Sequence, residues 1–166
     1  MVAIGSSGRP TACAMRWGFK DPGENRMHLT AVESVRLPKW AGGRRAVVPA
    51  ISFYETDWQR EWWSFHQSRW EPMWLAGLWH KRSDGLSFTL FTKPAVKPVK
   101  DIHDRMACPL AWDEAEQFLA GDWPPGRASR VRLSGLPALD RDRGKGRRRV
   151  QKADGSPKLF DDDEPL

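Results

Sequence analysis

The sequence lacks several features that would each indicate a class of protein. It has only two cysteines, Cys13 and Cys108, in 166 residues, which is too few for a disulfide framework. No apolar run approaches the roughly 18 residues that a membrane-spanning helix requires. No basic start leads into an apolar stretch, the pattern of an export signal. We therefore expect a cytoplasmic protein in which Cys13 is a small buried apolar residue and Cys108 has no chemical role.

Positive charge and tryptophan are plentiful by comparison. The chain carries 27 Lys and Arg against 21 Asp and Glu, a formal net charge of +6, so an anionic partner suits the protein without being required. Ten tryptophans are present. Most of them are expected to pack in the core, and one or two could instead offer a flat face on which a nucleic-acid base stacks.

Composition divides the chain into three parts. Residues 1–10 are small and glycine-containing and are predicted to be a flexible N-terminus. Residues 11–125 have the apolar content of one domain. Residues 126–166 are first basic and then acidic, with 11 Lys and Arg against 7 Asp and Glu from residue 127 onward, and few large apolar residues interrupt them. They are predicted to be a disordered tail that either contacts nucleic acid or only solubilises the protein.

Strand signals dominate the domain. The run Leu75–Trp79 predicts a buried strand whose glycine lets a neighbour approach closely. Lys81–Gly85 predicts a hairpin turn, and Leu86–Thr92 is its return strand. Only Trp112–Leu119 predicts a helix, with acids in its first turn and a glycine after its end. The fold class is therefore α+β, with a mixed, mostly antiparallel sheet that curls toward a barrel and short helices at its margin.

Two segments carry candidate chemistry. His103 and Arg105 lie in a predicted loop, where a histidine can exchange protons near neutral pH and an arginine can hold a phosphate; the alternative is a solvated turn with a local ion pair. In Ile51–Glu55, alternation places the carboxylate of Glu55 on the apolar face of a strand with Phe53. A carboxylate there needs either an arginine partner or a task in proton transfer.

Five sequence blocks occur in one order along most of the chain. They are Arg16-Trp-Gly-Phe19, Val47-Val-Pro-Ala50 with Ser52-Phe-Tyr-Glu55, Leu75-Ala-Gly-Leu-Trp79, Thr92-Lys-Pro-Ala95 and Ile102-His-Asp-Arg-Met106. In order and spacing they resemble the SRAP family (SOS response-associated peptidase, or abasic-site processing proteins). The resemblance covers about Arg16 to Trp123 and implies a compact β-fold that agrees with the predicted fold class.

The resemblance also implies a function. Glu55 and His103 match the residues that act as acid and base beside an abasic sugar. Arg16, Trp17, Tyr54 and Arg105 are expected to grip single-stranded DNA. The family forms a covalent protein–DNA linkage and acts as a peptidase on its own initiator methionine, and we expect no action on other proteins. We expect no metal and no cofactor, no membrane partner, and a monomer associated with the nucleoid.

The chain departs from the family pattern at several positions. Relatives begin Met-Cys-Gly-Arg-Phe and use the amine and thiol of that cysteine together, whereas this chain reads Met-Val-Ala. Leu29 and Ala31 stand where relatives have asparagine and arginine, although Asn25 or His28 could reach the same space. Thr56 follows the glutamate in place of a tryptophan, and the next tryptophan is Trp58. Stable capture of DNA by the family route is therefore expected to fail.

Three hypotheses follow from these departures. The chain is an abasic-site processing enzyme whose gene start is shortened or misassigned, or it is a degenerate relative that binds single-stranded DNA without forming a bond. The third is a non-catalytic remnant or interaction protein. Within the first hypothesis, an α-amine exposed at Val2 by removal of Met1 would condense with the aldehyde as an imine. Lys93, Lys97 and Lys100 either solubilise the loop before His103 or bind phosphate.

Overall fold

The computed structural model describes residues 2–4, 10–19, 28–34, 44–82, 85–138, 150–151 and 157–158. The strands of the large sheet are β1 (Val2–Ile4), β2 (Pro10–Ala12), β3 (Arg16–Trp17), β4 (Leu29–Ala31), β5 (Arg44–Ala50), β8 (Met73–Arg82), β9 (Gly85–Pro94), β10 (Arg105–Ala107) and β11 (Pro109–Leu110). The remaining strands are β6 (Ser52–Thr56), β7 (Trp62–Gln67), β12 (Leu133–Pro137), β13 (Val150–Gln151) and β14 (Pro157–Lys158). The helical elements are α1 (Trp112–Ala120) and the 3₁₀ turns η1 (Val32–Ser34), η3 (Ser68–Trp70) and η4 (Val99–Asp101).

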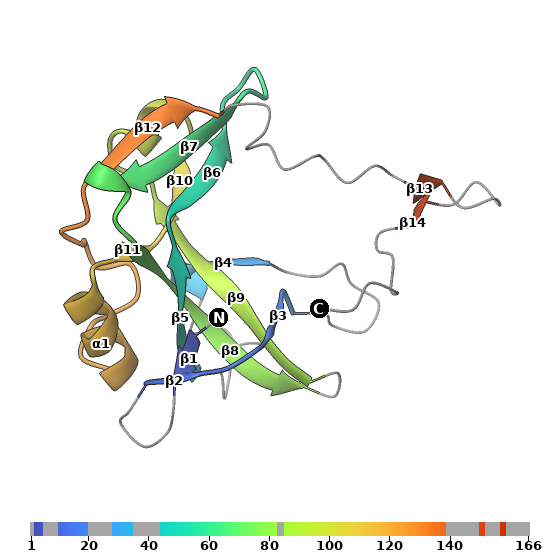
Figure 1. Ribbon diagram of the computed structural model, residues 1–166, viewed down its shortest axis with the longest axis vertical. Coiled ribbons are helices and arrows are strands. Elements are labelled where there is room, and N and C mark those ends of the chain that lie inside the picture. The colour runs from blue at the N-terminus through green and yellow to red at the C-terminus, as the bar shows by residue number, and fades with distance from the viewer. Residues whose placement is uncertain are drawn as a thin grey trace.

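The large sheet is built around the hairpin of β8 and β9. Its strand order is β10-β9-β8-β5-β1-β2, and β11 adds to β8 while β3 and β4 add to β9. The pairs of β3 and β4 with β9 are parallel and the other pairs of this sheet are antiparallel. A second sheet, β12-β7-β6, lies across one end of these long strands (Figure 1). The predicted fold class, a mixed and mostly antiparallel curled sheet with few helices, is confirmed.

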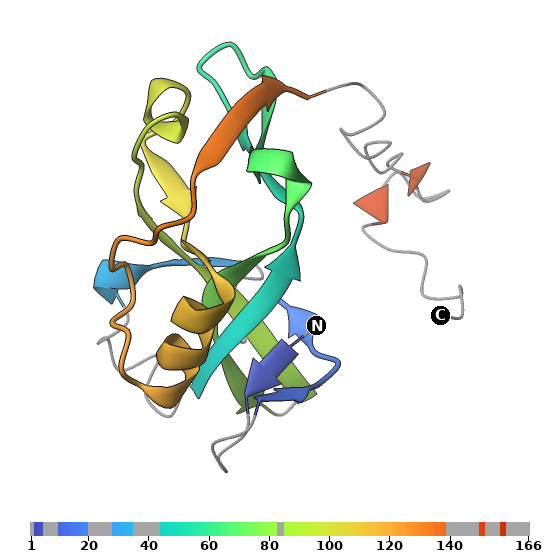
Figure 2. The ribbon, with the colours of Figure 1, turned by 60° about the vertical axis from the view of Figure 1, so that its left-hand side comes forward.

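Alternation along β8 explains how one sheet serves two cores. Ala76 and Leu78 face the cluster that α1 covers, whereas Met73 and Leu75 face the cluster that the three-stranded sheet covers. Side chains of successive strand residues point to opposite faces, so the near-continuous apolar run Met73–Trp79 fills both sides of the strand. Figure 2 shows α1 against the lower part of the long strands and the second sheet, with the orange strand β12, at their upper end.

Gly77 sets the spacing at the centre of the hairpin. A Cβ atom built on Gly77 would lie 2.2 Å from the backbone oxygen of Thr89 on β9. The close approach predicted for this glycine is therefore present. At the turn of the hairpin Arg82 pairs with Gly85, whose φ of +112° favours glycine. Residues 83 and 84 of the predicted turn lie outside the described residues.

The helix ends as its sequence predicts. Gly121 follows α1 with a φ of +107°, and its N–H donates to the carbonyl oxygen of Gln117 at 3.0 Å. At the start of the helix, Glu114 accepts the N–H of Ala111 at 2.9 Å, which satisfies one of the open donors of the first turn. Within the described part of the chain, α1 and the short turns are too brief to span a membrane.

Described residues on both sides of the predicted domain, 11–125, pair with its strands. Residues 2–4 form β1, which pairs with β5 and β2, so part of the predicted flexible N-terminus lies in the sheet. Residues 126–138 are also part of the fold, because β12 pairs along its whole length with β7. Both short strands form hydrogen bonds with the backbone groups of a strand that is distant in sequence. The composition of a segment gives no sign of such long-range pairing. The rest of the predicted tail, apart from β13 and β14, lies outside the described residues.

Candidate active site

Glu55 and His103 meet although they come from separate elements. Glu55 lies on β6, and His103 follows η4 in the loop that leads to β10. The Oε2 atom of Glu55 lies 3.7 Å from Nδ1 of His103, and the two side chains are 21% and 43% exposed. The pair is thus partly shielded and still open to solvent, as an acid–base pair that acts on an incoming molecule must be.

Burial of Glu55 changes its acidity. On β6, Phe53 is buried among apolar residues and Glu55 lies on the same side of the strand. Loss of solvation raises the pKa of the Glu55 carboxyl above its usual range, and the nearby imidazole of His103 partly opposes the shift. Burial thus disfavours the charged form of Glu55, as predicted for a carboxylate on this face. The group that partly compensates is the histidine His103 and not the predicted arginine.

The loop that carries His103 is closed by backbone hydrogen bonds. The N–H of His103 donates to the carbonyl oxygen of Val99 at 2.8 Å, and the N–H of Ala95 donates to that of Asp104 at 2.9 Å. The imidazole Nδ1 lies 3.1 Å from the N–H of Arg105 and 2.9 Å from its carbonyl oxygen, and the tautomer determines which of the two bonds forms. The ring is therefore fixed next to Glu55 by its own local backbone.

The middle residue of the motif has a local role. The carboxylate of Asp104 accepts a hydrogen bond from Nζ of Lys100 at 2.5 Å, which lowers the pKa of Asp104. The solvated-turn interpretation thus holds for Asp104, while its neighbours His103 and Arg105 both turn to residues far away in the sequence. Lys100 is one of the three lysines considered for phosphate binding, and this ion pair occupies it.

Arg105 is already paired. Its guanidinium donates to both carboxylate oxygens of Glu33, at 2.9 Å and 3.4 Å, and to the hydroxyl and carbonyl oxygens of Thr92, at 3.2 Å and 2.7 Å. This hydrogen bonding lowers the pKa of Glu33. A phosphate that approaches Arg105 must therefore compete with a carboxylate, which reduces the free charge predicted for this position.

Trp17 and Arg105 lie along one face of β9. Trp17 is 49% exposed and stacks on Phe88 with 6.4 Å between ring centroids; its indole N–H donates to the carbonyl oxygen of His28 at 3.0 Å. Phe88 and Thr92 share a face of β9 and are about 14 Å apart along the strand, at about 3.4 Å per residue. Arg16 precedes Trp17 on β3 and is exposed, and strand alternation directs its side chain away from that of Trp17. One face thus runs from Trp17 to the guanidinium of Arg105.

Tyr54 lies apart from this face. It alternates with Glu55 on β6, so its ring projects to the opposite side of the strand. There it is partly exposed and meets the edge of Trp62 at 6.4 Å. The structure brings together Glu55, His103 and Arg105, with Trp17 farther along the same face, and it places Tyr54 elsewhere.

The departures from the resemblance pattern fall on β4. Leu29 is exposed and Ala31 is partly buried. Because both side chains are apolar, neither supplies a polar group. His28 is held edge-on to Trp17, with centroids 5.3 Å apart, and Asn25 lies outside the described residues. Cys108 is buried, which raises the pKa of its thiol to about 12, so it is no nucleophile at neutral pH. Cys13 is partly exposed, so its predicted burial is only partial.

Sequence reasoning missed the two residues that hold Arg105. No role was predicted for Glu33, and Thr92 was named only as the first residue of one block. The separation of 72 residues between Glu33 and Arg105 leaves no local signal for their pairing. Among the described residues, no three His, Cys, Asp or Glu side chains gather in a way that would hold a metal ion.

Comparisons with known proteins identify the family and the fold. The model of the family described as SOS response associated peptidase (SRAP) matches residues 5–135. A crystal structure of a protein from Bordetella bronchiseptica is similar over 83% of this chain and 82% of that one, with a TM-score of 0.66 and 20% identity. A crystal structure from Bacteroides thetaiotaomicron is similar over 68% of this chain and 58% of that one, with a TM-score of 0.56 and 12% identity. These two structures share the fold; a search of curated proteins gave no significant match.

Proposed function

The chain belongs to the SOS response associated peptidase (SRAP) family, and from this premise we propose that it processes abasic sites in single-stranded DNA. Glu55 and His103 are the proposed acid and base, and Trp17 and Arg105 are the proposed contacts to the strand. The observation that carries the proposal is the 3.7 Å approach of the Glu55 carboxylate to the His103 imidazole. Two proton-transfer groups at this distance, both partly open to solvent, suit a reaction on a sugar.

The chemistry needs two proton transfers. An abasic deoxyribose is mostly a cyclic hemiacetal, and it reacts as an aldehyde only after its ring opens. Ring opening moves one proton onto the ring oxygen and removes one from the anomeric hydroxyl, with no net change in protons. Because its pKa is raised, Glu55 holds a proton more readily than an exposed glutamate and is suited to donate it to the ring oxygen. His103 is suited to accept the hydroxyl proton, and an amine of the protein then condenses with the aldehyde and releases water.

The strand contacts are proposed from the shape of one face. The path from Trp17 along β9 to Arg105 offers an aromatic surface at one end and a guanidinium at the other. Stacking on an aromatic ring contributes about 1–3 kcal/mol per base and tolerates any base. Such a path favours binding that depends on an exposed, unstacked strand and not on sequence. Tyr54, on the opposite side of β6, is left out of this path.

Trapping with borohydride tests the proposal. The protein is incubated with a single strand that carries one abasic site, and borohydride reduces any imine to a stable amine linkage. We expect linkage for the wild-type protein and at least a tenfold slower linkage for Glu55→Gln and His103→Gln. Glu71→Gln removes an exposed carboxylate and serves as the matched control. An unreacted wild-type protein, in an experiment where a control amine is trapped, would refute the proposal.

A second function is favoured by the occupied state of Arg105 and by the apolar residues on β4. Pairing with Glu33 and the presence of Leu29 and Ala31 reduce the polar grip on a reacting sugar. In this alternative the protein binds single-stranded DNA without forming a bond. Equal affinity for intact and abasic strands, measured by fluorescence anisotropy, together with no trapping, would favour it.

A further inference from the structure

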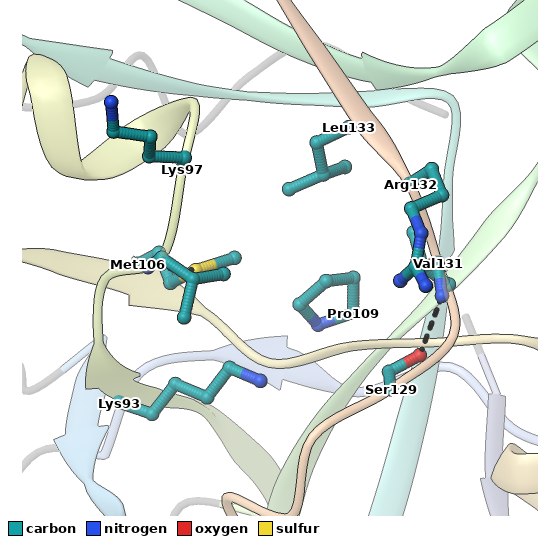
Figure 3. A pocket seen from close by; sticks show the side chains of 9 residues that line it. Lys93, Lys97, Met106, Pro109, Ser129, Val131, Arg132 and Leu133 are labelled. Atoms are coloured by element: carbon teal, nitrogen blue, oxygen red, sulfur yellow. Dashed lines mark hydrogen bonds between the residues drawn. The ribbon is translucent and has the colours of Figure 1, made fainter.

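A small cavity has a lining that includes neither Glu55 nor His103. Residues of β9 and β10, of the loop at Val96 and of the segment that leads into β12 line it (Figure 3). Its volume is about 130 Å³. Met106, Pro109 and Leu133 form its apolar walls, and Lys93, Lys97 and Arg132 contribute its basic groups. Three basic side chains beside apolar walls attract an anion and favour its binding with part of its hydration shell removed.

Lys93 is the unusual member of this group. Its side chain is only 7% exposed, and in Figure 3 it extends across the cavity toward the side of Ser129. Among the residues that the structure describes, no carboxylate lies within ion-pairing distance of its ammonium group. Buried lysines are rare unless a partner compensates for the lost hydration. The missing partner is the observation that points to a ligand.

The two other basic residues lie at the rim. Arg132 is exposed on the segment before β12. Lys97 is mostly exposed and lies 3.9 Å from Asp101, an ion pair on the outer surface that water screens. Both can turn toward an anion that Lys93 holds from within.

The negative charge near the cavity is already satisfied. The carboxylate of Glu114 accepts hydrogen bonds from the Ser129 hydroxyl and from the N–H groups of Ala111 and Arg130. The Ser129 hydroxyl also accepts the N–H of Val131 at 3.1 Å. Glu114 therefore lies behind Ser129 as part of the helix start and does not neutralise Lys93.

The cavity is separate from the candidate active site. Lys93 and Thr92 are neighbours on β9, so their side chains leave the strand on opposite faces. Thr92 holds Arg105 beside His103, and Lys93 pairs across the ladder with Met106 on the cavity side. The cavity and the contact to Arg105 therefore use neighbouring residues of the same strand.

We infer that this cavity is a binding site for a phosphate group, with Lys93 as its buried anchor and Arg132 and Lys97 at its mouth. The volume decides the size of the ligand. Pockets for nucleosides and similar molecules enclose roughly 300–1,000 Å³, well above the 130 Å³ found here, whereas a single phosphate needs the room of only a few water molecules. The site takes inorganic phosphate or the terminal phosphate of a nucleic-acid strand, and the strand itself remains outside.

Thermal unfolding in phosphate tests the site without any abasic DNA. A ligand that binds the folded state raises the melting temperature. We expect inorganic phosphate at millimolar concentration to raise it by about 2–5 °C over chloride of equal ionic strength. Lys93→Met keeps the length of the side chain and removes the charge, and it should abolish this rise. Lys81→Met, at an exposed position, is the matched control and should retain it.

Short single strands without an abasic site then identify the source of the phosphate. Binding of a 5′-phosphorylated strand at least tenfold tighter than its 5′-hydroxyl form, lost in Lys93→Met and weakened in the exposed Arg132→Gln variant, assigns the site to strand ends. Equal binding of both strands, with the rise in melting temperature retained, assigns it to free phosphate. A phosphate effect no larger than that of chloride, or an equal effect in Lys93→Met, would overturn the inference. None of these strands carries an aldehyde, so the outcome is independent of the proposed function.

Discussion

Arg105 donates to both carboxylate oxygens of Glu33, at 2.9 Å and 3.4 Å, across 72 residues of sequence. Glu33 thus covers the arginine that the resemblance assigns to DNA binding. Thr92 holds the same guanidinium through its hydroxyl and its carbonyl oxygen, so the side chain keeps its place whether or not Glu33 is paired with it. Glu33 acts as an internal competitor for the phosphate that Arg105 would bind.

Replacing Glu33 with Gln should therefore strengthen binding to single-stranded DNA. The substitution frees the charge of Arg105 at a position that is half exposed, so the fold should be retained. We expect a 3- to 10-fold rise in affinity at low salt. The slope of log affinity against log salt should steepen by about 0.7, the value for one added phosphate contact on a single strand.

Glu71→Gln is the control for that experiment, because it changes the net charge equally at an exposed position. An equal gain in both variants would mean that only the total charge matters and that Arg105 takes no part in binding.

The stability of the protein should depend on Glu55 in a defined pH direction. Burial raises the pKa of Glu55 in the folded state, so the folded protein holds this proton more readily than the unfolded chain. The stability linked to the proton is fully present below the ordinary pKa of glutamate and is lost as pH rises through the raised value. Glu55→Gln should be more stable than the wild-type protein at pH 7, and the difference should vanish near pH 4.

Urea unfolding at several pH values measures this difference. A Glu55→Gln protein that is less stable than wild type at neutral pH would show that the carboxylate stabilises the fold, contrary to the burial argument.

Gly77 should tolerate no side chain. Its Cβ position lies 2.2 Å from the backbone oxygen of Thr89, and the backbone of a central hairpin cannot move aside cheaply. Gly77→Ala should lower the free energy of unfolding by about 1–3 kcal/mol or more, the range for overpacked cores. Ser134→Ala, exposed on β12, should change it by less than about 0.5 kcal/mol. Equal urea midpoints for the two variants would contradict the close approach of β8 and β9.

Two truncations separate the fold from the tail. Removal of residues 126–166 deletes β12, which pairs with β7 and covers the fully buried Phe65, and should destabilise the domain strongly. Removal of residues 139–166 spares β12 and should lower the melting temperature less than the longer deletion does. The shorter deletion takes away eight Lys and Arg with seven Asp and Glu, and its basic part precedes its acidic part. The protein that lacks residues 139–166 should bind single-stranded DNA more weakly, and its affinity should depend less steeply on salt. An unchanged salt slope would contradict a DNA-binding tail.

Local pattern predicted much of the scaffold. Alternation placed Glu55 on the side of Phe53, the composition of Leu75–Trp79 indicated a buried strand that needs a glycine, and Gly121 marked the end of α1. Each of these features depends on neighbours within a few residues. The meeting of Glu55 with His103 was expected from the resemblance alone and is present in the structure.

The remaining features depend on partners far along the chain. Residues 2–4 and 133–137 have weak strand signals of their own and become strands because β5 and β7 offer open backbone groups. The pairing of Arg105 with Glu33 and the burial of Lys93 arise in the same way, from the meeting of distant segments. Tyr54 was assigned to the DNA-binding set from its place in the motif, and strand alternation directs it away from that face.

The rate of reaction with abasic single-stranded DNA in a double-mutant cycle of Glu55→Gln and His103→Gln tests the central claim most directly. Acid–base groups contribute about 10²- to 10⁴-fold to a rate, and groups that act as a unit are not additive. We predict that each single variant reacts at least 100-fold more slowly than wild type and that the double variant is hardly slower than either. Rates within threefold of wild type for the single variants, or fully multiplicative losses in the double variant, would contradict a joint site built from these two residues.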